Sequence, residues 1–312
     1  MISRRLLRIK ILQILYARSN SDDVGIVSLE KDLIFSIQKA YDLYFYILLL
    51  VIPIRQYAES RIELARNKKL PTYEDLHPNT RFIDNEAIKK IENHPEFIQY
   101  LNEHKLSWVN YPELIKNLYN RLIESPYYKE YMERSKCTFK DNRQLLIDFY
   151  TNELEEHDMF YDILEEQSIY WNDDIEFIVS MVIKTIQEMR TKKANILPLY
   201  KTDDDKEFAF RLLHATIVHY DECRKLIEHY IDNWDIERVA NIDNLILHMA
   251  INELIEFPSI PVKVTFDEYL ELAKYYSTPK SSIFINGLLD KISTDMIQEG
   301  KIAKTGRGLD VE

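Results

Sequence analysis

Glycine is scarce in this sequence: 312 residues contain only five glycines, where average usage of about 7% would give roughly twenty. Phosphate-binding loops of the G-x-G-x-x-G or G-x-x-x-x-G-K-[ST] kind need clustered glycines, because the backbone must approach the ligand closely. No such cluster occurs, and a G-x-S-x-G nucleophile elbow is also absent. The shortage disfavours nucleotide-binding doubly wound folds and turn-rich β folds, which rely on glycine at positive φ.

Cysteine and long apolar runs are scarce as well. The two cysteines, Cys137 and Cys223, lie far apart and outside any C-x-x-C pattern, which disfavours a disulfide framework and a structural zinc site. The longest apolar run, 43–54, contains Pro53 and is much shorter than the roughly 20 residues of a membrane span. We therefore expect a cytoplasmic protein without membrane association, in which this run is a buried helix segment.

Catalytic and metal-binding patterns are not evident among the polar residues. The eight histidines form no H-E-x-x-H motif, and the repeated Glu-x-x-His pairs of a di-iron bundle are missing. The acidic cluster at 155–158 fits a solvated surface better than a metal site. The three acids at 203–205 fit a helix start after Thr202 better than a magnesium site. We predict no catalytic residues, no metal and no cofactor.

The charge is unevenly distributed. The chain carries a net charge of −12, whereas residues 1–18 contain Arg4, Arg5, Arg8, Lys10 and Arg18 and no acid. Arg4 and Arg8 are four residues apart and share a helix face. Because cations at a helix N-terminus oppose the helix dipole, this arrangement favours binding of an anionic partner over a merely solvated helix start.

Helical periodicity dominates the chain, and period-2 alternation is scarce, so we predict an all-α fold. Residues 171–189, for example, place apolar side chains at spacings of three and four. The strongest linker signals are 68–81 and 194–202. The expected helices are 2–18, 28–67 with a kink near Pro53, 84–104, 112–124, 126–136, 140–167, 172–193, 203–231, 235–257, 262–276 and 280–298.

One octapeptide near the C-terminus, 284–291 (FINGLLDK), contributes to two adjacent helical stripes. The first consists of Phe284, Leu288 and Lys291, and the second, Ile285, Leu289 and Ile292, suits the core. Phe284 and Lys291 lie on one face, with Gly287 inside the predicted helix, where it costs about 1 kcal/mol relative to alanine. Such a glycine marks close approach either of a neighbouring helix or of a ligand. Both interpretations remain open from the sequence.

The segment 234–293 resembles the C-terminal half of NusB, a bacterial transcription antitermination family. The shared pattern includes Asp243, Glu253-Leu254, the E-L-A-K run at 271–274 and the 284–291 block, and 208–227 looks like the preceding family helices. The N-terminal Arg4-Arg5-x-x-Arg8 run is similar to the arginine-rich first helix of the family. The sequence departs from the family pattern at His248, where an arginine is usual, and at Ile283, where a basic residue is common.

The resemblance implies an all-α, NusB-like helical bundle with an additional helical insertion after the first helix. We expect four parts, which the following ranges define: a basic N-terminal helix at 1–20, the helical insertion at 21–202, the C-terminal helical bundle at 203–298, and a flexible tail at 299–312.

The resemblance also implies a function without catalysis. Family members bind boxA-type single-stranded RNA together with NusE, a small-subunit ribosomal protein, and act with the RNA polymerase complex on ribosomal RNA transcription. On this basis we expect arginine and lysine side chains to contact phosphates. Phe284 is the expected stacking ring, Asn286 the amide that reads a base edge, and Tyr16 a ring that supports the same surface. The expected RNA-binding residues are Arg4, Arg5, Arg8, Tyr16, Lys280, Phe284, Asn286 and Lys291.

Two alternatives belong to other classes. The first is a helical protein-interaction scaffold with weakened RNA binding, which the net charge and the departures at His248 and Ile283 favour. The second is an RNA cytosine methyltransferase, since some of these enzymes carry a NusB-like domain. The few glycines and the scarcity of strand patterns disfavour the methyltransferase.

Overall fold

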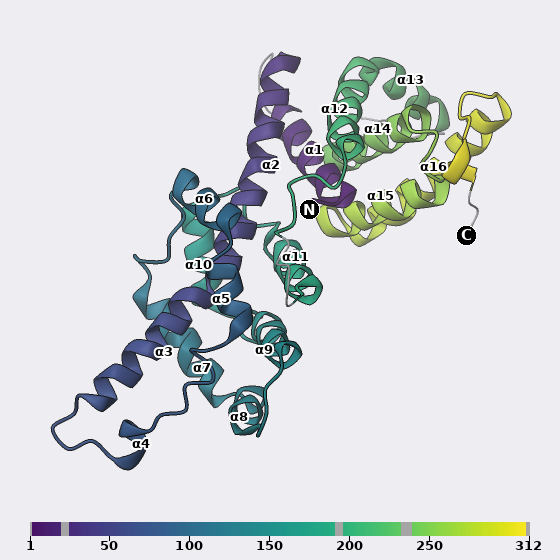
Figure 1. The fold of residues 1–312 in the computed structure, drawn as a ribbon. Helices are drawn as coiled ribbons and strands as arrows, with labels where there is room; N and C mark the ends of the chain where they lie inside the picture. The colour runs from purple at the N-terminus through teal and green to yellow at the C-terminus, as the bar shows by residue number, and fades with distance from the viewer. Residues whose placement is uncertain (1, 20–24, 191–195, 232–238, 310–312) are drawn as a thin grey trace. The chain divides into compact units, whose positions relative to one another are not determined.

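A computed structural model describes residues 2–19, 25–190, 196–231 and 239–309 (Figure 1). Several expectations fall partly outside these ranges. They are the two ends of the 1–20 segment, the start of the 21–202 insertion and its residues 191–195, the end of the 172–193 helix, the start of the 194–202 linker, residues 232–238 of the 203–298 bundle with the start of the 235–257 helix, and the last three residues of the tail. The described residues contain helices and no β-strand, so the predicted all-α class is confirmed.

The helices follow one another through the whole chain. In order, they are α1 (Arg4–Ser19), α2 (Ile26–Leu49), α3 (Val51–Arg66), α4 (Tyr73–Leu76), α5 (Glu86–Glu92), α6 (Pro95–His104), α7 (Pro112–Glu124), α8 (Pro126–Glu133), α9 (Phe139–Asn152), α10 (Asp158–Gln167), α11 (Ile175–Glu188), α12 (Asp203–Val218), α13 (Tyr220–Tyr230), α14 (Asn241–Glu256), α15 (Val262–Tyr276) and α16 (Pro279–Gln298), followed by a short 3-10 turn η2 (Gly306–Leu309).

Several expected long helices are split, for identifiable reasons. The 28–67 helix breaks at Leu50, because Pro53 cannot donate to the carbonyl of Leu49 and its ring crowds that group. The 84–104 helix is interrupted before Pro95, which opens α6 and disfavours helical backbone at the preceding residue. The 140–167 helix is interrupted near Glu156, whose φ of 53° is left-handed.

The chain divides into two compact units. Unit 1 comprises Gln38–Leu199, and unit 2 combines Ile2–Ile37 with Tyr200–Glu312. Unit 2 therefore gathers α1 and the first part of α2 with α12 to α16, although α1 and α12 are far apart in the sequence.

The core of unit 1 contains the aromatic run of α2. Tyr44, Phe45 and Tyr46 are buried; the ring of Phe45 stacks on Tyr100 and that of Tyr46 on Trp108, both with centroids 3.8 Å apart. Rings of this size bury large apolar areas, and such pairs stabilise a core beyond area burial alone. These rings are therefore part of the core of unit 1.

One helical stretch of the described residues, Ile26–Arg66, is long and apolar enough to cross a membrane by length and composition. Inside this stretch, 72% of the most apolar window is buried in the fold, as is usual for a core helix. The expected burial of the 43–54 run is confirmed, since most of its side chains are inaccessible.

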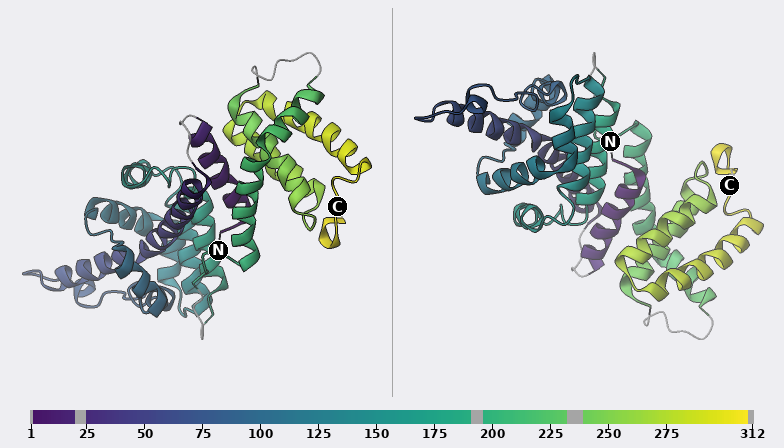
Figure 2. Two further views of the ribbon diagram at one scale, coloured as in Figure 1. Left: turned by 90° about the horizontal axis from the view of Figure 1, so that it is seen from above. Right: turned by 90° about the horizontal axis from the view of Figure 1, so that it is seen from below.

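Unit 2 is built around α14, which packs against α1, α12, α15 and α16. Figure 2 shows these helices from above and below. The central position of α14 explains why it is apolar nearly all the way round, with consecutive buried residues from Leu245 to Leu254. Polar side chains within that span, such as Glu253, must therefore find partners inside the unit.

The segment expected as a flexible tail packs against the end of α14 as far as it is described. Ile302 is buried, and Lys304 Nζ donates to the carbonyls of Leu254 (3.0 Å) and Phe257 (3.1 Å). These carbonyls lie at the helix C-terminus, where the helix itself offers no donors, so a lysine there is favourable. Burial lowers the pKa of Lys304 to about 8.

Gly308 makes this docking possible, and its replacement is expected to release the tail. A Cβ at Gly308 would lie 1.9 Å from the carbonyl oxygen of Pro258, a contact that backbone atoms cannot relieve locally. Gly308→Ala should therefore speed hydrogen exchange at the Thr305 amide, which donates to the same oxygen at 3.0 Å. As a control, Gly287→Ala adds a methyl group in open space and should leave this exchange unchanged. Equal exchange in Gly308→Ala and the parent chain would contradict the docking.

Candidate nucleic-acid interface

Helix α1 buries one face in unit 2 and carries its arginines at the beginning. Leu6, Leu7, Ile11 and Leu15 are buried, and the helix packs against α12 and α14. The apolar side chains of the later turns are thus buried. The three arginines nevertheless differ strongly in accessibility and in partners.

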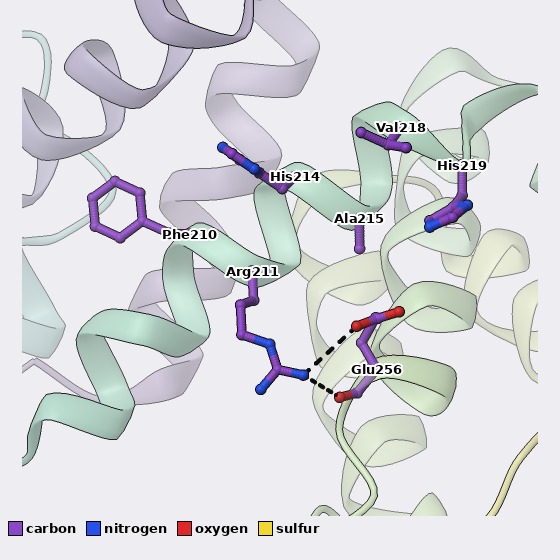
Figure 3. A pocket seen from close by; sticks show the side chains of 7 residues that line it. All are labelled: Phe210, Arg211, His214, Ala215, Val218, His219 and Glu256. Carbon is purple, nitrogen blue, oxygen red and sulfur yellow. Dashed lines mark hydrogen bonds and ion pairs between the residues drawn. The ribbon is translucent and has the colours of Figure 1, made fainter.

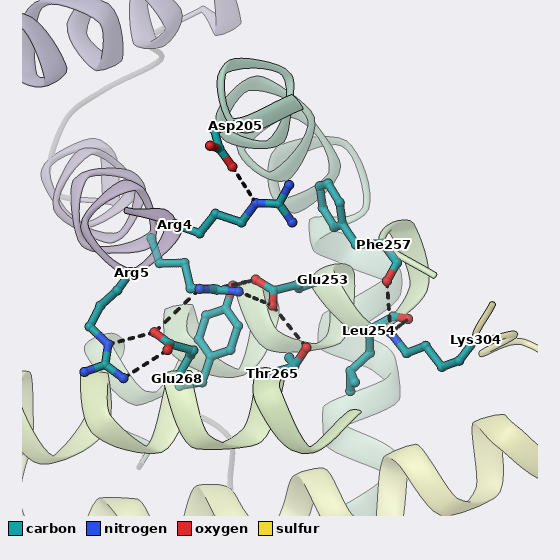
Figure 4. Close-up of polar contacts among 11 residues, drawn as sticks. Arg4, Arg5, Asp205, Glu253, Leu254, Phe257, Thr265, Glu268 and Lys304 are labelled. Carbon is teal, nitrogen blue, oxygen red and sulfur yellow. Dashed lines mark hydrogen bonds and ion pairs between the residues drawn. The ribbon is translucent and has the colours of Figure 1, made fainter. Parts of the chain in front are cut away.

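Arg8 lies inside the unit and forms a two-pronged ion pair with Glu253, the carboxylate labelled in Figure 4. Its Nε donates to Oε2 at 2.7 Å and its Nη2 to Oε1 at 2.6 Å, and its side chain is only 3% exposed. Thr265 and Tyr269 each donate to Glu253 at 3.0 Å, which completes the environment of this carboxylate. Arg8 therefore holds α1 to α14, and no phosphate can reach it in this arrangement.

The pKa values of Arg8 and Tyr269 both depend on burial and on the nearby carboxylate of Glu253. Burial opposes the charge of Arg8, but Coulombic attraction and hydrogen bonding to Glu253 outweigh it and raise the pKa of the guanidinium. Burial, followed by the negative charge of Glu253, raises the pKa of Tyr269 well above 10. Arg8 thus stays cationic, and Tyr269 stays a neutral hydrogen-bond donor.

Arg4 and Arg5 are partly exposed, with 34% and 50% of their side chains accessible. Arg5 donates from Nε and Nη2 to the two oxygens of Glu268 on α15, at 2.8 and 2.9 Å. Arg4 donates from Nε alone to Oδ1 of Asp205 on α12, at 2.9 Å, and its guanidinium lies over the ring of Phe208.

These carboxylates supply a structural reason for cations at the start of a helix. Asp205, Glu253 and Glu268 compensate the unfavourable interaction of the arginines with the helix dipole. The dipole by itself thus no longer requires an external anion. Helix α12 begins after Thr202 as expected, but the Thr202 side chain makes no capping hydrogen bond, and Asp205 pairs with Arg4.

Helix α16 presents the second group of expected residues. Lys280, Asn286 and Lys291 are exposed, and Phe284 is half-buried. Lys280, Phe284, Gly287 and Lys291 follow one another at helical spacings of four, three and four, so they form one stripe. We call this the α16 stripe; Asn286 lies beside it.

Gly287 lies in open space within the α16 stripe. No heavy atom would come within 4 Å of an added Cβ, so close packing with a neighbouring helix is wrong as the reason for this glycine. The bare backbone instead leaves a gap between the side chains of Phe284 and Lys291.

Exposed aromatic rings lie on α1 and at the end of α15. Tyr16 is exposed on α1, and Gln13 Nε2 donates to Tyr276 Oη at 3.4 Å, three residues before α16 begins. The neighbouring Tyr275 is 67% exposed, and sequence reasoning did not single it out. The sequence feature that could have identified Tyr275 is the pair of tyrosines directly after the E-L-A-K run, at the end of a predicted helix.

His214 and His219 both contact a nearby glutamate. A pocket of about 300 Å³ on α12 is lined by residues such as Arg211, His214 and His219 (Figure 3). His214 contacts Glu30 at 2.5 Å, and Arg211 Nη2 donates to the carbonyl of Glu256 at 2.8 Å. Within the described residues, no group of three or more His, Cys, Asp or Glu is placed to hold a metal ion.

His157 departs from the expected solvated surface at 155–158. It is buried, and its Nδ1 accepts from the Phe160 amide at 3.2 Å, which caps the start of α10. Burial lowers its pKa. The acids around it, Glu155, Glu156 and Asp158, are exposed as expected.

Comparison with known proteins identifies a match to the NusB family model at residues 175–294. Three relatives named transcription antitermination protein NusB are similar to part of the chain. The protein from Salinibacter ruber is 43% identical over 113 residues, which are 36% of this chain and 71% of the relative. The protein from Thermodesulfovibrio yellowstonii is 43% identical over 104 residues, 33% of this chain and 69% of the relative. The protein from Chloroherpeton thalassium is 38% identical over 104 residues, 33% of this chain and 49% of the relative.

No solved structure matches the chain at a comparable level of significance. The family match begins at residue 175, upstream of residue 203, and ends just beyond the α16 stripe. It includes the positions of Glu253 and Glu268, which hold α1 in unit 2. NusB homologues are transcription factors without catalytic activity, in agreement with the prediction of a non-enzyme. The chain belongs to the NusB family.

Proposed function

We propose that this chain is an RNA-binding transcription antitermination factor that binds boxA-type single-stranded RNA together with NusE and acts on ribosomal RNA transcription. One observation carries the proposal. Unit 2 combines partly exposed arginines at the start of α1 with the exposed cations and half-buried ring of the α16 stripe, and the stripe lies inside the NusB family match at residues 175–294.

The chemistry of these groups suits single-stranded RNA. Splayed bases stack on aromatic rings and hydrogen-bond through their edges, while Arg and Lys neutralise phosphates. Arg4, Arg5, Lys280 and Lys291 provide the phosphate contacts. Arg8 keeps a role in the proposal as a positioning residue, because its pair with Glu253 fixes the start of α1.

Rings and one amide provide the base contacts. Phe284 is half-buried, which fixes its orientation while leaving one part of the ring accessible for stacking. Asn286 is exposed and can read a base edge through its paired donor and acceptor. Tyr16 supports the same surface, and Tyr275 is a further stacking candidate that the structure adds.

The proposed protein partners follow from family and charge. NusE is a ribosomal protein, and a basic partner suits a chain with a net charge of −12. The RNA polymerase complex is the proposed destination of the assembly. Unit 1 has no role assigned in this proposal, since most of it lies outside the family match.

A second candidate is a helical interaction scaffold with weakened RNA binding. Ile283, at a position where the family commonly has a basic residue, is 76% exposed and supplies no charge next to Phe284. The ion pairs of Arg4 and Arg5 also reduce the positive field of α1. RNA binding that fails to distinguish boxA-type from scrambled sequences would favour this candidate.

Removal of three exposed cations should weaken RNA binding and reduce its salt dependence. Arg4→Ala/Lys280→Ala/Lys291→Ala removes up to three phosphate contacts, each of which contributes roughly 0.7 to the slope of log K against log salt. We expect the magnitude of that slope to fall by about 2. Fluorescence anisotropy with a labelled boxA-type RNA at several salt concentrations measures it.

A matched control removes three exposed lysines from unit 1: Lys89→Ala/Lys116→Ala/Lys129→Ala. Both triple variants change the net charge equally, so a general electrostatic effect would lower both slopes alike. The proposed interface instead predicts a change in the first variant alone. Circular dichroism of both proteins verifies that they remain folded.

A further inference from the structure

We infer that Glu268 is a built-in competitor of RNA at Arg5, so that Arg5 binds a phosphate by exchange whereas Arg4 binds one by addition. The inference rests on the proposed RNA-binding function and concerns how tightly the same surface binds. The inference follows from the hydrogen bonds that Arg4 and Arg5 already make, because these bonds occupy different edges of the two guanidinium groups.

Arg5 uses one complete edge of its guanidinium for Glu268. Its Nε and Nη2 donate to the two carboxylate oxygens at 2.8 and 2.9 Å, a parallel two-bond arrangement. Phosphate oxygens prefer the same two-pronged geometry. A phosphate that binds this edge must therefore displace Glu268, and the 50% exposure of Arg5 leaves the edge reachable.

Arg4 is arranged differently. It donates to Asp205 from Nε alone, and none of the described residues accepts a hydrogen bond from its two Nη nitrogens. The ring of Phe208, 5.0 Å from the guanidinium carbon, supports one face of the group. A phosphate can therefore use the Nη edge of Arg4 while the contact with Asp205 persists.

The displaced carboxylate would keep a compensating charge. Oε2 of Glu268 lies 3.5 Å from Nη1 of Arg8, so Glu268 remains beside a cation when Arg5 turns to RNA. Because Glu268 is partly exposed, water can also solvate it. Exchange at Arg5 thus leaves no uncompensated buried charge, which would otherwise forbid it.

The test compares three carboxylate-to-amide variants by anisotropy with boxA-type RNA. Glu268→Gln keeps the shape and one acceptor, but a neutral acceptor competes less well for Arg5. We expect about fivefold tighter binding, which corresponds to about 1 kcal/mol, the upper range for an exposed ion pair. Because Arg5 contacts a phosphate in both proteins, the slope of log K against log salt should change by less than one phosphate contact, that is by less than roughly 0.7.

Two matched variants separate exchange from simple charge removal. Glu271 also interacts electrostatically with Arg5 but pairs with Lys274 at 2.6 Å, so Glu271→Gln removes a nearby charge without freeing the Arg5 edge. Asp205→Asn frees only the Nε of Arg4. Both should change RNA affinity less than twofold, whereas simple charge removal predicts equal gains in all three.

The double variant Arg5→Ala/Glu268→Gln completes a double-mutant cycle with the two single variants Arg5→Ala and Glu268→Gln. The inference predicts that this variant binds no more tightly than Arg5→Ala, because the gain passes through Arg5. A gain that persists without Arg5, or a Glu268→Gln affinity equal to that of the parent, would overturn the inference while leaving the proposed function intact. If the parent chain binds no RNA, the proposed function fails and the inference falls with it.

Discussion

Arg8→Ala is expected to destabilise unit 2 by about 3–5 kcal/mol, the usual cost of leaving one member of a buried ion pair without its partner. The substitution would strand Glu253, which is fully buried and has Arg8 as its cationic partner at 2.6–2.7 Å. Thr265 and Tyr269 would still donate to it, but neither carries a compensating charge. Urea-dependent hydrogen exchange of amides in α14 and α15 measures the loss for unit 2 itself.

Two other variants make this prediction specific. Arg5→Ala removes an exposed pair and should cost at most about 1 kcal/mol. Arg8→Met/Glu253→Leu removes both charges and should recover much of the stability, although Thr265 and Tyr269 then lose their acceptor. Equal losses in Arg8→Ala and Arg5→Ala would contradict the structural role assigned to Arg8.

His248 should make unit 2 sensitive to acid. Its ring is fully buried, both ring nitrogens lack a hydrogen-bond partner, and it stacks on Tyr220. Burial, with a smaller contribution from the positive charge of Arg224, lowers its pKa from 6.5 to about 4. The unfolded chain therefore binds more protons between these values, and stability falls as the pH drops through this range. The loss attributable to His248 should approach about 3 kcal/mol near pH 4.

His248→Leu tests the assignment. This variant should be at least as stable as the parent chain at pH 7.5, because it removes unpaired polar atoms from the core. Its advantage should grow as the pH falls from 6.5 to 4. His229→Leu replaces an exposed histidine and should follow the parent profile. Parallel pH profiles for His248→Leu and the parent chain would exclude His248 as the source of acid sensitivity.

The burial of His248 also changes the significance of a departure from the family sequence. The position lies inside α14, away from solvent, so the histidine removes no surface charge from the proposed RNA contact. Ile283 is the departure that lies on the surface, close to the α16 stripe. The two differences looked equivalent in the sequence, because helical periodicity is uninformative where a helix is apolar all the way round.

Local patterns predicted the helices well and their ends less well. Spacings of three and four residues identify α11, and the apolar run 43–54 identifies the buried end of α2 and the buried start of α3. The interruptions at Leu50 and near Glu156 depend on one lost hydrogen bond and one left-handed residue. Such single-residue events hardly alter the periodicity of a long segment.

The sequence predicted which side chains cluster at the site, but not which carboxylates pair with its arginines. The clustering of Arg4, Arg5 and Arg8 on one helix is visible in the sequence, as is the spacing of the α16 stripe. Their carboxylate partners are not, because Asp205, Glu253 and Glu268 lie 201, 245 and 263 residues further along the chain. Tertiary packing alone assigns Arg8 to the core and Arg5 to the surface.

The most direct test of the central proposal is a titration of the full chain with boxA-type RNA and with a scrambled RNA of equal length and composition, each with and without NusE. Both RNAs carry the same phosphates, so any difference in affinity reports base recognition and not charge. The proposed function predicts tighter binding of the boxA-type sequence and a further gain when NusE is present. Equal affinities for the two RNAs, unchanged by NusE, would contradict it.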